Sequence, residues 1–592
     1  MCTRENRCGG YLAILLGILC FIRPTGAQER VLHSFDRKKL TDVYYSEGAA
    51  VGDINRDGHL DIIYGPYWYE GPTFEKKHEI YEPKPQPTNF YADNFFTWVY
   101  DFNGDGWPDL LVVGLPGTPA FVFENPAGKS DGHWEKHQVF DSVGNESPQF
   151  VDLLGSKRPV LVCTHKGEFG FVVPNWEHPF KAWTFHAISE KSNREKYPHG
   201  LGVGDLNGDG RADVLIATGW FEQPEANADS TTWVFHPALF TSAYGGAEMY
   251  VYDVNGDGRN DVITSLAAHD FGLAWFEQDV VRGKPIFRQH IIVGEHAEQN
   301  PYGIVFSELH SVALADMDGD GVKDIITGKT YWSHHKASPQ WDAGAVVYWF
   351  SLQRNKDDVQ WIPHLADPDA GIGRQIRIDD VNGDKLPDIV VGGMKGAHLL
   401  THKTTKVDQA TWDAAQPKIV YPQLRPLHRG TDAPLTAGKW EGALEVEDLP
   451  IIGTPSGQTS VQEMAGFPAD LWSGGKQLFW SGAKSGDRLE LEIKAPQAGE
   501  YDLQAVFTMA RDFAVVQPLL DGKPIGGVLD LYNFPDVIST GVQTLGRAQL
   551  SAGAHRFGVE IKGANPSATA GGNRVGLDAV KLVSVAGAKT AN

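Results

Sequence analysis

The chain has 592 residues, enough for two or three domains, and its formal net charge is −23. Such an acidic surface repels phosphate backbones, so nucleic acid is not an expected partner. No stretch after residue 27 is long and apolar enough to be a transmembrane helix.

Segment 1–27 has the pattern of a signal peptide, in which a basic leader precedes the apolar run 11–22. Thr25 and Ala27 are the small residues expected before cleavage, so we expect a secreted or periplasmic mature protein. Three of the four cysteines lie in this segment. Cys163 is then the one cysteine of the mature chain, which excludes an internal disulfide bond.

An acidic nine-residue motif begins at positions 53, 101, 205, 253, 316 and 380. A degenerate copy around Asp152 lies in the double-length gap between the second and third motifs. Each copy is flanked by apolar strands, and steps of 48 to 64 residues suit a four-stranded unit. We therefore predict an all-β chain with a seven-bladed β-propeller over residues 31–405. Segment 31–45 could supply the strand that completes the last blade.

The motif, as in DLNGDGRAD at 205–213, is typical of a calcium-binding loop. Side-chain oxygens at positions 1, 3, 5 and 9 and a backbone carbonyl at position 7 would supply the ligands that Ca²⁺ prefers. Glycine at position 6 permits a positive φ. Arg56 replaces the glycine at position 4 of the first loop, and Lys385 replaces the glycine at position 6 of the last. Acidic turns without metal are the alternative. The expected calcium ligands are Asp53, Asn55, Asp57, Asp61, Asp101, Asn103, Asp105, Asp109, Asp205, Asn207, Asp209, Asp213, Asp253, Asn255, Asp257, Asp261, Asp316, Asp318, Asp320, Asp324, Asp380, Asn382, Asp384 and Asp388.

On these motifs, residues 46–400 resemble the FG-GAP/VCBS repeats of β-propellers, also seen in the integrin head, and are loosely similar to aldos-2-ulose dehydratase propellers. The resemblance implies that each acidic loop joins the innermost strand of a blade to the second, so the metals share one face. Residues entering the first strands and leaving the second strands would then lie on the opposite face, around the axis. Binding proteins and enzymes share this scaffold, so the resemblance does not decide the function.

Histidines, carboxylates, cations and aromatic residues occupy those entry and exit positions, and we interpret them as a central funnel. The mixture suits a polyhydroxylated ligand, because aromatic rings pack on sugar C–H surfaces and charged groups bind hydroxyls or carboxylates. Histidines and carboxylates also suit acid–base catalysis near neutral pH. A solvated rim without function is the alternative, and a second metal held by His199, Glu248, His269 and His310 is a further possibility. The candidate catalytic residues are His199, Glu248, His269, His310, Lys329 and Arg374, with Glu146 as another entry residue. The candidate substrate-binding residues of the funnel are Glu47, Trp68, Asn94, His165, Lys166, Trp220, Asp270, Trp332 and His334.

The repeats stop near residue 402, and segment 406–439 is interpreted as a linker. Alternating strands separated by Gly-rich turns then predict an antiparallel β-sandwich over residues 440–586. An E-x-E strand and a closing VGLDAVKL strand resemble the galactose-binding-like sandwiches of carbohydrate-binding-module families 6 and 35. The resemblance implies a structural calcium at Glu445, Glu447 and Asp578. Trp472, Trp480, Arg511 and Tyr532 are candidate sugar contacts, although the tryptophans could equally be core residues.

Together these features predict a secreted, calcium-stabilised, carbohydrate-active protein. The funnel would bind a sugar or an acidic polysaccharide, and the sandwich would hold the polymer nearby. If the funnel is catalytic, lyase or dehydratase chemistry suits its residues best. The main alternative is a non-catalytic glycan-binding or cell-surface adhesion protein, and a scaffold for protein partners is a third hypothesis. The sequence does not fix the oligomeric state.

Overall fold

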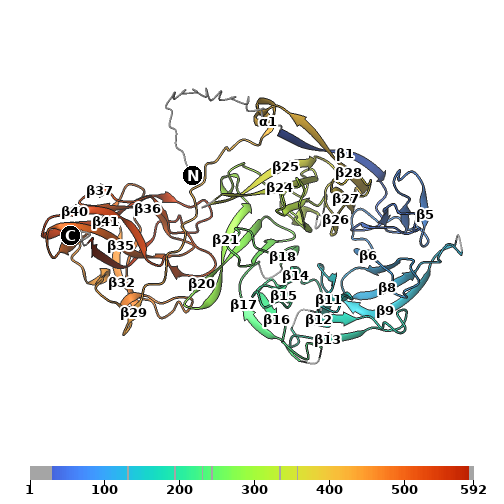
Figure 1. The fold of residues 1–592 in the computed structure, drawn as a ribbon, viewed down its shortest axis with the longest axis horizontal. Coiled ribbons are helices and arrows are strands. Elements are labelled where there is room, and N and C mark those ends of the chain that lie inside the picture. The colour runs from blue at the N-terminus through green and yellow to red at the C-terminus, as the bar shows by residue number, and fades with distance from the viewer. Residues whose placement is uncertain are drawn as a thin grey trace, which may run out of the picture. The chain divides into compact units, whose positions relative to one another are not determined.

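The computed structural model describes residues 30–129, 132–192, 195–229, 231–241, 245–332, 335–355 and 358–585 (Figure 1). The expected signal peptide and His334 lie outside the described residues. Within these ranges the chain forms 42 β-strands and one α-helix, which confirms the predicted all-β class. Among the described residues, no helix has the length and apolar character needed to cross a membrane.

The repeats fold into seven groups of four strands, which we call blades 1 to 7. The acidic loops join the first strand of a blade to the second, because each motif lies between two adjacent antiparallel strands. Blades 4 and 5 are also joined edge to edge, since Leu201 lies opposite Glu248 in a parallel pairing of their first strands. The first three blades contain β2 (Ala50–Gly52), β3 (Asp61–Tyr64), β4 (Tyr67–Tyr69) and β5 (Lys77–Glu79); β6 (Phe96–Tyr100), β7 (Asp109–Val113), β8 (Thr118–Glu124) and β9 (Glu135–Val143); and β10 (Gln149–Val151), β11 (Val160–His165), β12 (Glu168–Val173) and β13 (Thr184–Ala187). Blades 4 to 6 contain β14 (Leu201–Gly204), β15 (Asp213–Ile216), β16 (Gly219–Glu222) and β17 (Val234–Pro237); β18 (Glu248–Tyr252), β19 (Asp261–Ser265), β20 (Leu273–Val281) and β21 (Lys284–Val293); and β22 (Val312–Ala315), β23 (Asp324–Lys329), β24 (Val346–Asn355) and β25 (Asp358–Asp367).

The N-terminal strand completes the last blade. Blade 7 contains β26 (Ile376–Asp379), β27 (Asp388–Gly393) and β28 (Gly396–Val407), and β1 (Arg30–Thr41) pairs with β28 as its outer strand. Gly48 and Gln375 form a parallel bridge between the entries of blades 1 and 7. The two ends of the repeat array therefore meet, as a propeller requires.

A repeated aromatic stack holds the outer half of the blades together. On the third strand Trp68, Trp220, Trp275 and Trp349 lie directly opposite the fourth-strand residues His78, His236, His290 and His364. The rings are stacked with centroids 4.0–4.4 Å apart. A glutamate two residues after the tryptophan binds the same histidine in three of these blades, as Glu222 does with His236 at 2.7 Å. Apolar clusters between adjacent blades include these tryptophans, so their role is packing.

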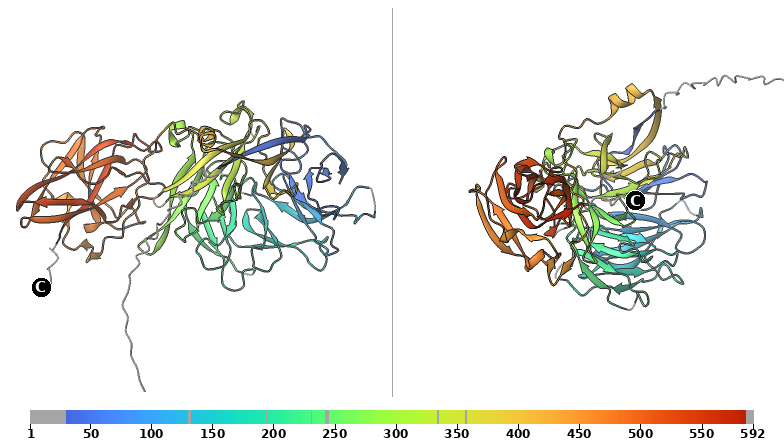
Figure 2. Two further views of the ribbon diagram at one scale, coloured as in Figure 1. Left: turned by 45° about the horizontal axis from the view of Figure 1, so that its top comes forward. Right: turned by 60° about the vertical axis from the view of Figure 1, so that its left-hand side comes forward.

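The C-terminal strands form two sheets of a sandwich, drawn in orange and red (Figure 2). Their facing side chains make one apolar core around Trp480, Tyr501 and Phe507. The first sheet contains β31 (Leu444–Glu445), β32 (Gln458–Glu463), β33 (Lys476–Ser481), β35 (Gly499–Met509), β39 (Ile538–Ser539), β40 (Gln543–Leu550) and β42 (Val575–Ser584). The second contains β34 (Arg488–Ala495), β36 (Ala514–Leu520), β37 (Lys523–Pro524), β38 (Leu529–Asp530) and β41 (Gly553–Ala564), and β29 (Leu435–Thr436) pairs with β30 (Lys439–Trp440) ahead of both. Short 3₁₀ helices are η1 (Ala297–Gln299), η2 (His335–Ala337), η3 (Val446–Asp448) and η4 (Ser473–Gly475).

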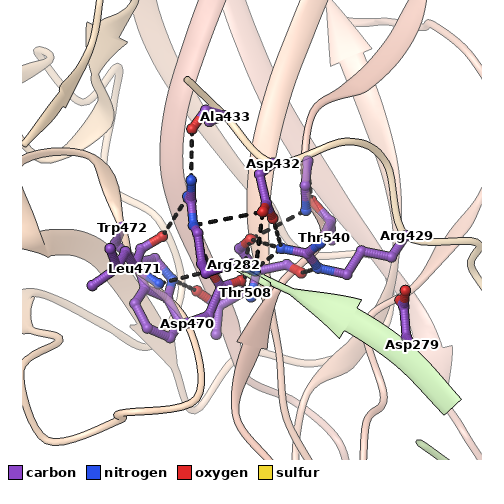
Figure 3. A network of polar contacts seen from close by, with 12 residues as sticks. Asp279, Arg282, Arg429, Asp432, Ala433, Asp470, Leu471, Trp472, Thr508 and Thr540 are labelled. Carbon is purple, nitrogen blue, oxygen red and sulfur yellow. Dashed lines mark hydrogen bonds and ion pairs between the residues drawn. The ribbon is translucent and has the colours of Figure 1, made fainter. Parts of the chain in front are cut away.

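The hairpin β20–β21 of blade 5 packs against the sandwich. Its Val281 and Ile286 belong to the same apolar cluster as the sandwich core. At its tip Arg282 donates hydrogen bonds to Asp470 Oδ1 at 3.2 Å and to the carbonyl of Ala433 at 2.9 Å (Figure 3). Arg429 binds the other oxygen of Asp470 at 2.9 Å. This buried polar network fixes the blade 5 hairpin to the sandwich.

A separate small unit consists of residues 30–33 and 404–416, as far as the structure describes it. Its helix α1 (Gln409–Ala415) is N-capped by Asp408, whose side chain accepts a hydrogen bond from the Thr411 amide. Arg30 donates to Gln409 Oε1 at 2.8 Å and its guanidinium lies over the Trp412 ring.

Candidate functional site

The acidic loops share one backbone conformation. The first aspartate accepts amide hydrogen bonds from positions 4 to 6, as Asp205 does from Gly208 and Gly210 at 2.8 Å. Positions 4 and 6 take a positive φ even where the residue is not glycine. Arg56 at position 4 of the first loop has φ 61°, and Lys385 at position 6 of the last loop has φ 71°. The degenerate copy keeps the turn, since Asp152 accepts from the amides of Ser156 and Lys157. The turn itself therefore depends on the first aspartate and not on the full set of acids.

The ninth-position aspartates have a structural role that the sequence analysis missed. Asp213 is fully buried, and its two oxygens accept the amide hydrogens of Leu206 at 2.9 Å and Gln223 at 3.0 Å. Burial raises its pKa to about 6. Each ninth-position residue makes an equivalent pair of bonds, one to the loop and one to the third strand or the residues just after it: Asp61, Asp109, Asp213, Asp261, Asp324 and Asp388.

The remaining loop oxygens fit a hard cation. In the fifth loop one carboxylate oxygen each of Asp316, Asp318 and Asp320 lies within 4.8 Å of the others. Like charges this close repel one another unless a cation lies between them. An all-oxygen set of this kind is what Ca²⁺ binds. The expected calcium ligands at positions 1, 3 and 5 of this loop thus lie close enough to share one ion, and the oxygens of position 9, like those of position 1, also accept backbone amides.

A buried cluster of charged residues lies where the entries of blades 1, 3 and 7 meet. Arg374 is fully buried and donates to Glu47 Oε2 at 2.7 Å and to Glu146 Oε2 at 3.2 Å. Its guanidinium also lies 4.7 Å from the ring centre of Tyr91. Burial opposes the charge on Arg374, but the two glutamates raise its pKa. Tyr44 hydrogen-bonds Glu47, which completes the cluster.

Three of the candidate catalytic histidines converge beside that cluster. One ring nitrogen each of His199, His269 and His310 lies within 4.8 Å of the others. His199 and His310 are buried and His269 is partly exposed. His199 Nε2 lies 3.2 Å from Glu146 Oε2. Burial alone would raise the pKa of Glu146, but the neighbouring His199 and Arg374 lower it overall.

Two other candidate catalytic residues are engaged elsewhere. The carboxylate of Glu248 accepts bonds from the Val312 amide at 2.9 Å and from Ser311 Oγ at 3.3 Å. Burial raises its pKa to about 7. Glu248 is not part of the histidine group, which corrects its expected place in a second metal site. Lys329 is buried in an ion pair with Glu308, so its charge is already compensated.

The structure corrects part of the expected substrate-binding set. Trp68 and Trp220 point into the packing between blades, because their strand alternation places them opposite His78 and His236. His165 and Lys166 contact Asp141 at 3.6 Å and 2.8 Å, on the outer strand of blade 2, and not the central histidines.

Other expected funnel residues have partners of their own. Asn94 is buried and donates to Tyr81 Oη at 3.2 Å. Trp332 packs with Tyr44, Ala92 and Met394. Asp270 is exposed and its backbone carbonyl accepts the Glu308 amide. Glu47 is thus the expected substrate-binding residue that joins the buried charged cluster directly.

In the sandwich the expected calcium residues come together. Glu445 Oε2, Glu447 Oε2 and Asp578 Oδ1 are buried oxygens without a hydrogen bond among the described residues. Burial, together with the nearby charges of Glu445 and Glu447, raises the pKa of Asp578 to about 8. A Cβ at Gly474, which has φ 65°, would lie 3.5 Å from Glu445 Oε2 and 3.6 Å from Glu447 Oε1. Three unsatisfied carboxylate oxygens fit a structural cation.

The tryptophans expected to contact sugar belong to the sandwich core. Trp480 is fully buried and donates from Nε1 to the Ser456 carbonyl at 2.7 Å. Trp472 is also buried and donates to Thr508 Oγ1 at 2.8 Å. Both indoles have satisfied polar atoms and packed rings, so of the two alternatives the structure favours core packing over sugar contact. Arg511 is exposed, and Tyr532 is partly exposed.

Tyr532 lines a larger cavity that the sequence did not predict, although Asn255 and Asp257 of the expected calcium loops line it as well. The cavity has a volume of about 580 Å³ and lies between blades 5 and 6, segment 419–429 and the sandwich; we call it the cleft. Tyr302, Trp361 and Tyr532 supply aromatic surface to its walls. Glu277, Arg425, His428 and Asn565 are among its polar lining residues. The walls are held by Arg288, which donates to Asn533 Oδ1 at 3.0 Å and to the Leu427 carbonyl at 3.1 Å.

Comparison with known proteins supports the repeat assignment in one segment. Residues 197–235 match the FG-GAP repeat family. A search of curated proteins gave no match.

Three solved structures are similar to this chain at low identity. A lectin from Agrocybe aegerita that recognises non-reducing terminal N-acetylglucosamine is 13% identical, with 65% of this chain and 87% of the lectin covered and a TM-score of 0.33. A Paenibacillus xanthan lyase is 12% identical, with 90% and 41% covered and a TM-score of 0.22. The GH26-CBM35 β-(1,4)-mannanase of Podospora anserina is 16% identical, with 25% and 28% covered and a TM-score of 0.18. The chain thus spans less than half the length of the mannanase and of the lyase.

Proposed function

We propose that this protein is a carbohydrate-binding protein whose saccharide occupies the cleft between blades 5 and 6, segment 419–429 and the sandwich. The observation that supports the proposal is a cavity of about 580 Å³ lined by Trp275, Tyr302, Trp361 and Tyr532 and by amide, carboxylate and guanidinium groups. Its volume falls within the range of roughly 300–1,000 Å³ typical of ligand sites. Aromatic faces suit sugar C–H surfaces, and the amides and charges suit hydroxyl groups.

Pre-organisation of the cleft supports the same proposal. Arg288, which lines the cleft, donates two side-chain hydrogen bonds to other lining residues, Asn533 and the Leu427 carbonyl. Walls held in this way lose little conformational entropy when a ligand enters. Export through the N-terminal segment and calcium in the acidic loops and in the sandwich belong to the same proposal.

The test measures glycan binding by the full chain. A glycan array followed by titration calorimetry should find an oligosaccharide whose affinity falls at least tenfold in Tyr302→Ala and in Tyr532→Ala. Phe90→Ala is the matched control, because it removes an aromatic ring that is 57% exposed but does not line the cleft. This variant should bind the glycan normally. Two results would contradict the proposal. One is a loss of affinity in Phe90→Ala while Tyr302→Ala and Tyr532→Ala bind normally, and the other is a folded chain that binds no glycan.

A second candidate function is elimination chemistry at the group formed by His199, His269 and His310, because the three imidazoles converge there. In a lyase or dehydratase reaction a base removes the proton next to a carboxylate or carbonyl group. The electron pair then forms a carbon–carbon double bond, and the leaving oxygen takes up a proton. His269 is the partly exposed imidazole of the three and is the candidate base.

Incubation with uronate polysaccharides and keto-sugars tests this second function. Elimination creates an unsaturated product with new ultraviolet absorbance, and His269→Ala should abolish its formation. Glycan binding without any product excludes the enzyme and leaves the binding protein.

A further inference from the structure

We infer that Arg377 binds the carboxylate group of a small organic monoanion in a second cavity, which lies at the centre of the propeller near the acidic loops. We call it the axial cavity. The inference goes beyond the proposed function, because no residue that lines the axial cavity lines the cleft.

The axial cavity has a volume of about 320 Å³ and is lined mainly by the first strands of four neighbouring blades, β26, β2, β6 and β10. The first strands of adjacent blades contact one another, as β2 does with β6 and with β26, so these strands surround the axis. The lining residues lie at the loop ends of the strands. Tyr100 and Asp379 directly precede Asp101 and Asp380, the first aspartates of two acidic loops. The volume is enough for one small organic molecule.

A buried link lies between this cavity and the charged cluster at the other end of the same strands. Gln375 accepts a hydrogen bond from the Thr97 amide at 3.0 Å and donates one to the Thr97 carbonyl at 3.1 Å. Both residues are buried, and each precedes the cavity residues of its own blade. Arg374, next to Gln375, is already paired with Glu47 and Glu146. A ligand of the axial cavity is therefore kept apart from those buried ion pairs.

The guanidinium of Arg377 has no polar partner among the residues that the structure describes. It is partly buried and lines the axial cavity, yet it makes neither a hydrogen bond nor a salt bridge there. Arg288 and Arg374, by contrast, each donate two side-chain hydrogen bonds. A guanidinium carries five N–H donors, and leaving them unused away from bulk water costs free energy. An anion in the cavity would supply the missing acceptors.

The neighbouring acidic groups do not compensate this charge fully. Burial lowers the pKa of Arg377, and the opposing effects of Tyr250, Glu248 and Asp379 are smaller. The carboxylate of Glu248 already accepts two hydrogen bonds from blade 6. Asp379 is exposed, so water screens its charge. The positive charge of the guanidinium thus stays available to a ligand.

The lining favours a carboxylate on a compact organic body over an inorganic dianion. Trp98, Tyr100 and Phe150 supply aromatic surface, which suits an aromatic ring or the C–H face of a sugar ring. Arg377 is the one cation among the lining residues that the structure describes, and Asp379 would repel a second negative charge. One guanidinium binds one carboxylate through two parallel hydrogen bonds. A monoanion therefore matches the site better than sulfate or phosphate does.

The test is titration calorimetry of the calcium-saturated full chain with glucuronate, benzoate and sulfate. Glucuronate carries its carboxylate on a hydroxylated ring and benzoate carries it on an aromatic ring, so the two arms show which body the cavity accepts. One or both carboxylates should bind at one molecule per chain, with an affinity at least tenfold above that of sulfate.

Variants place the bound carboxylate. Arg377→Gln should lower its affinity at least tenfold, and Arg377→Lys should restore part of the loss, because it keeps the charge without the two parallel donors. Arg158→Gln is the matched control. Arg158 lies in the degenerate loop of blade 3 with its guanidinium 5.1 Å from the ring centre of Trp176, and it does not line the cavity. The cleft variant Tyr302→Ala should bind the carboxylate normally.

Thermal unfolding gives a second readout that does not depend on calorimetry. Without ligand, Arg377→Gln should melt at the same temperature as the wild type or higher, because it removes an unpartnered charge from a partly buried position. The carboxylate should raise the melting temperature of the wild type and of Arg158→Gln, but not that of Arg377→Gln.

Four results would overturn the inference. A folded wild-type chain that binds neither carboxylate would do so, as would sulfate binding as tight as that of the carboxylates. An affinity that is unchanged in Arg377→Gln but falls in Tyr302→Ala would place the carboxylate in the cleft. A lower melting temperature of Arg377→Gln without ligand would show that the guanidinium has partners within the fold.

Discussion

Arg282 at the tip of the β20–β21 hairpin donates to Asp470 Oδ1 of the sandwich at 3.2 Å. Asp470 is buried, and it also binds Arg429 at 2.9 Å and Ser539 Oγ at 2.6 Å. Burial alone would raise the pKa of Asp470, but hydrogen bonds from Ser539 and Leu471 and the charge of Arg429 lower it. One carboxylate therefore links a propeller blade, the linker and the sandwich (Figure 3).

Substitution of Asp470 should cost more stability than substitution of Arg282. Asp470→Ala removes the acceptor shared by Arg282, Arg429 and Ser539 but leaves Arg429 paired with Asp432, so the free energy of unfolding should fall by about 2–3 kcal/mol. Arg282→Ala leaves Asp470 paired with Arg429, so a loss of about 1–2 kcal/mol is expected. Urea unfolding measures both values. A larger effect of Arg282→Ala would contradict the network as described.

The ninth-position aspartates should stabilise the blades whether or not calcium is bound. Asp213→Ala leaves the buried amides of Leu206 and Gln223 without acceptors, and a loss of about 3 kcal/mol is expected. The same loss should appear in excess EGTA, because the bonds need no metal. Asp213→Asn keeps one acceptor oxygen but places its NH2 group against the other backbone N–H, so it should lose about as much as Asp213→Ala. Thermal unfolding with and without chelator is the measurement, and a loss confined to calcium-loaded protein would contradict this role.

Calcium binding should require the oxygen-bearing side chains at positions 3 and 5 of a loop and not only the turn. Asp205 and Asp152 both accept amide hydrogens within their loops, but the loop of Asp152 has Leu154 and Ser156 where the loop of Asp205 has Asn207 and Asp209. Asp205→Ala should therefore reduce the number of bound calcium ions by one, and Asp152→Ala should leave it unchanged. Equilibrium dialysis followed by metal analysis gives the count. Equal counts in the two variants would show that the loops do not bind as assigned.

Glu248 should make stability depend on pH. Burial raises its folded-state pKa from 4.5 to about 7, with Val312 and Ser311 as hydrogen-bond partners and Arg377 as the cation that acts on it. A raised carboxyl pKa contributes stability below the unfolded value, and that contribution is lost as the pH rises through the folded value. Relative to the wild type, Glu248→Gln should thus gain stability from pH 5 to pH 8, by on the order of 3 kcal/mol. Unfolding curves at both pH values give the difference, and an unchanged difference would contradict the assigned environment.

Several features of the fold were predictable because the repeats carry local signals. The six acidic motifs mark the turn between the first two strands of a blade, and the positive φ at Arg56 and Lys385 falls at positions 4 and 6, where the other complete motifs have glycine. The convergence of His199, His269 and His310 was also predictable, since all three are entry or exit residues of successive blades. Trp68 and Trp220 were misplaced, because the alternation of a strand of three or four residues is too short to show which face is buried.

The cleft could not be derived from sequence in the same way. Its walls come from residues as far apart as Tyr302, Arg425 and Tyr532, and no local pattern places them together. One signal was present in the longer steps between the motifs at 253, 316 and 380. Those steps correspond to the extended hairpins β20–β21 and β24–β25, whose strands have 9 or 10 residues. Long hairpins indicate an extra surface, but they do not identify what it binds.

Hydrogen–deuterium exchange with and without an oligosaccharide that binds the full chain tests the central claim most directly. The cleft predicts slower exchange in peptides that cover residues 299–302, 358–361, 419–429 and 530–533, with no change around His199, His269 and His310. Protection confined to the peptides of those three histidines, with the cleft peptides unchanged, would contradict the assignment of the saccharide site.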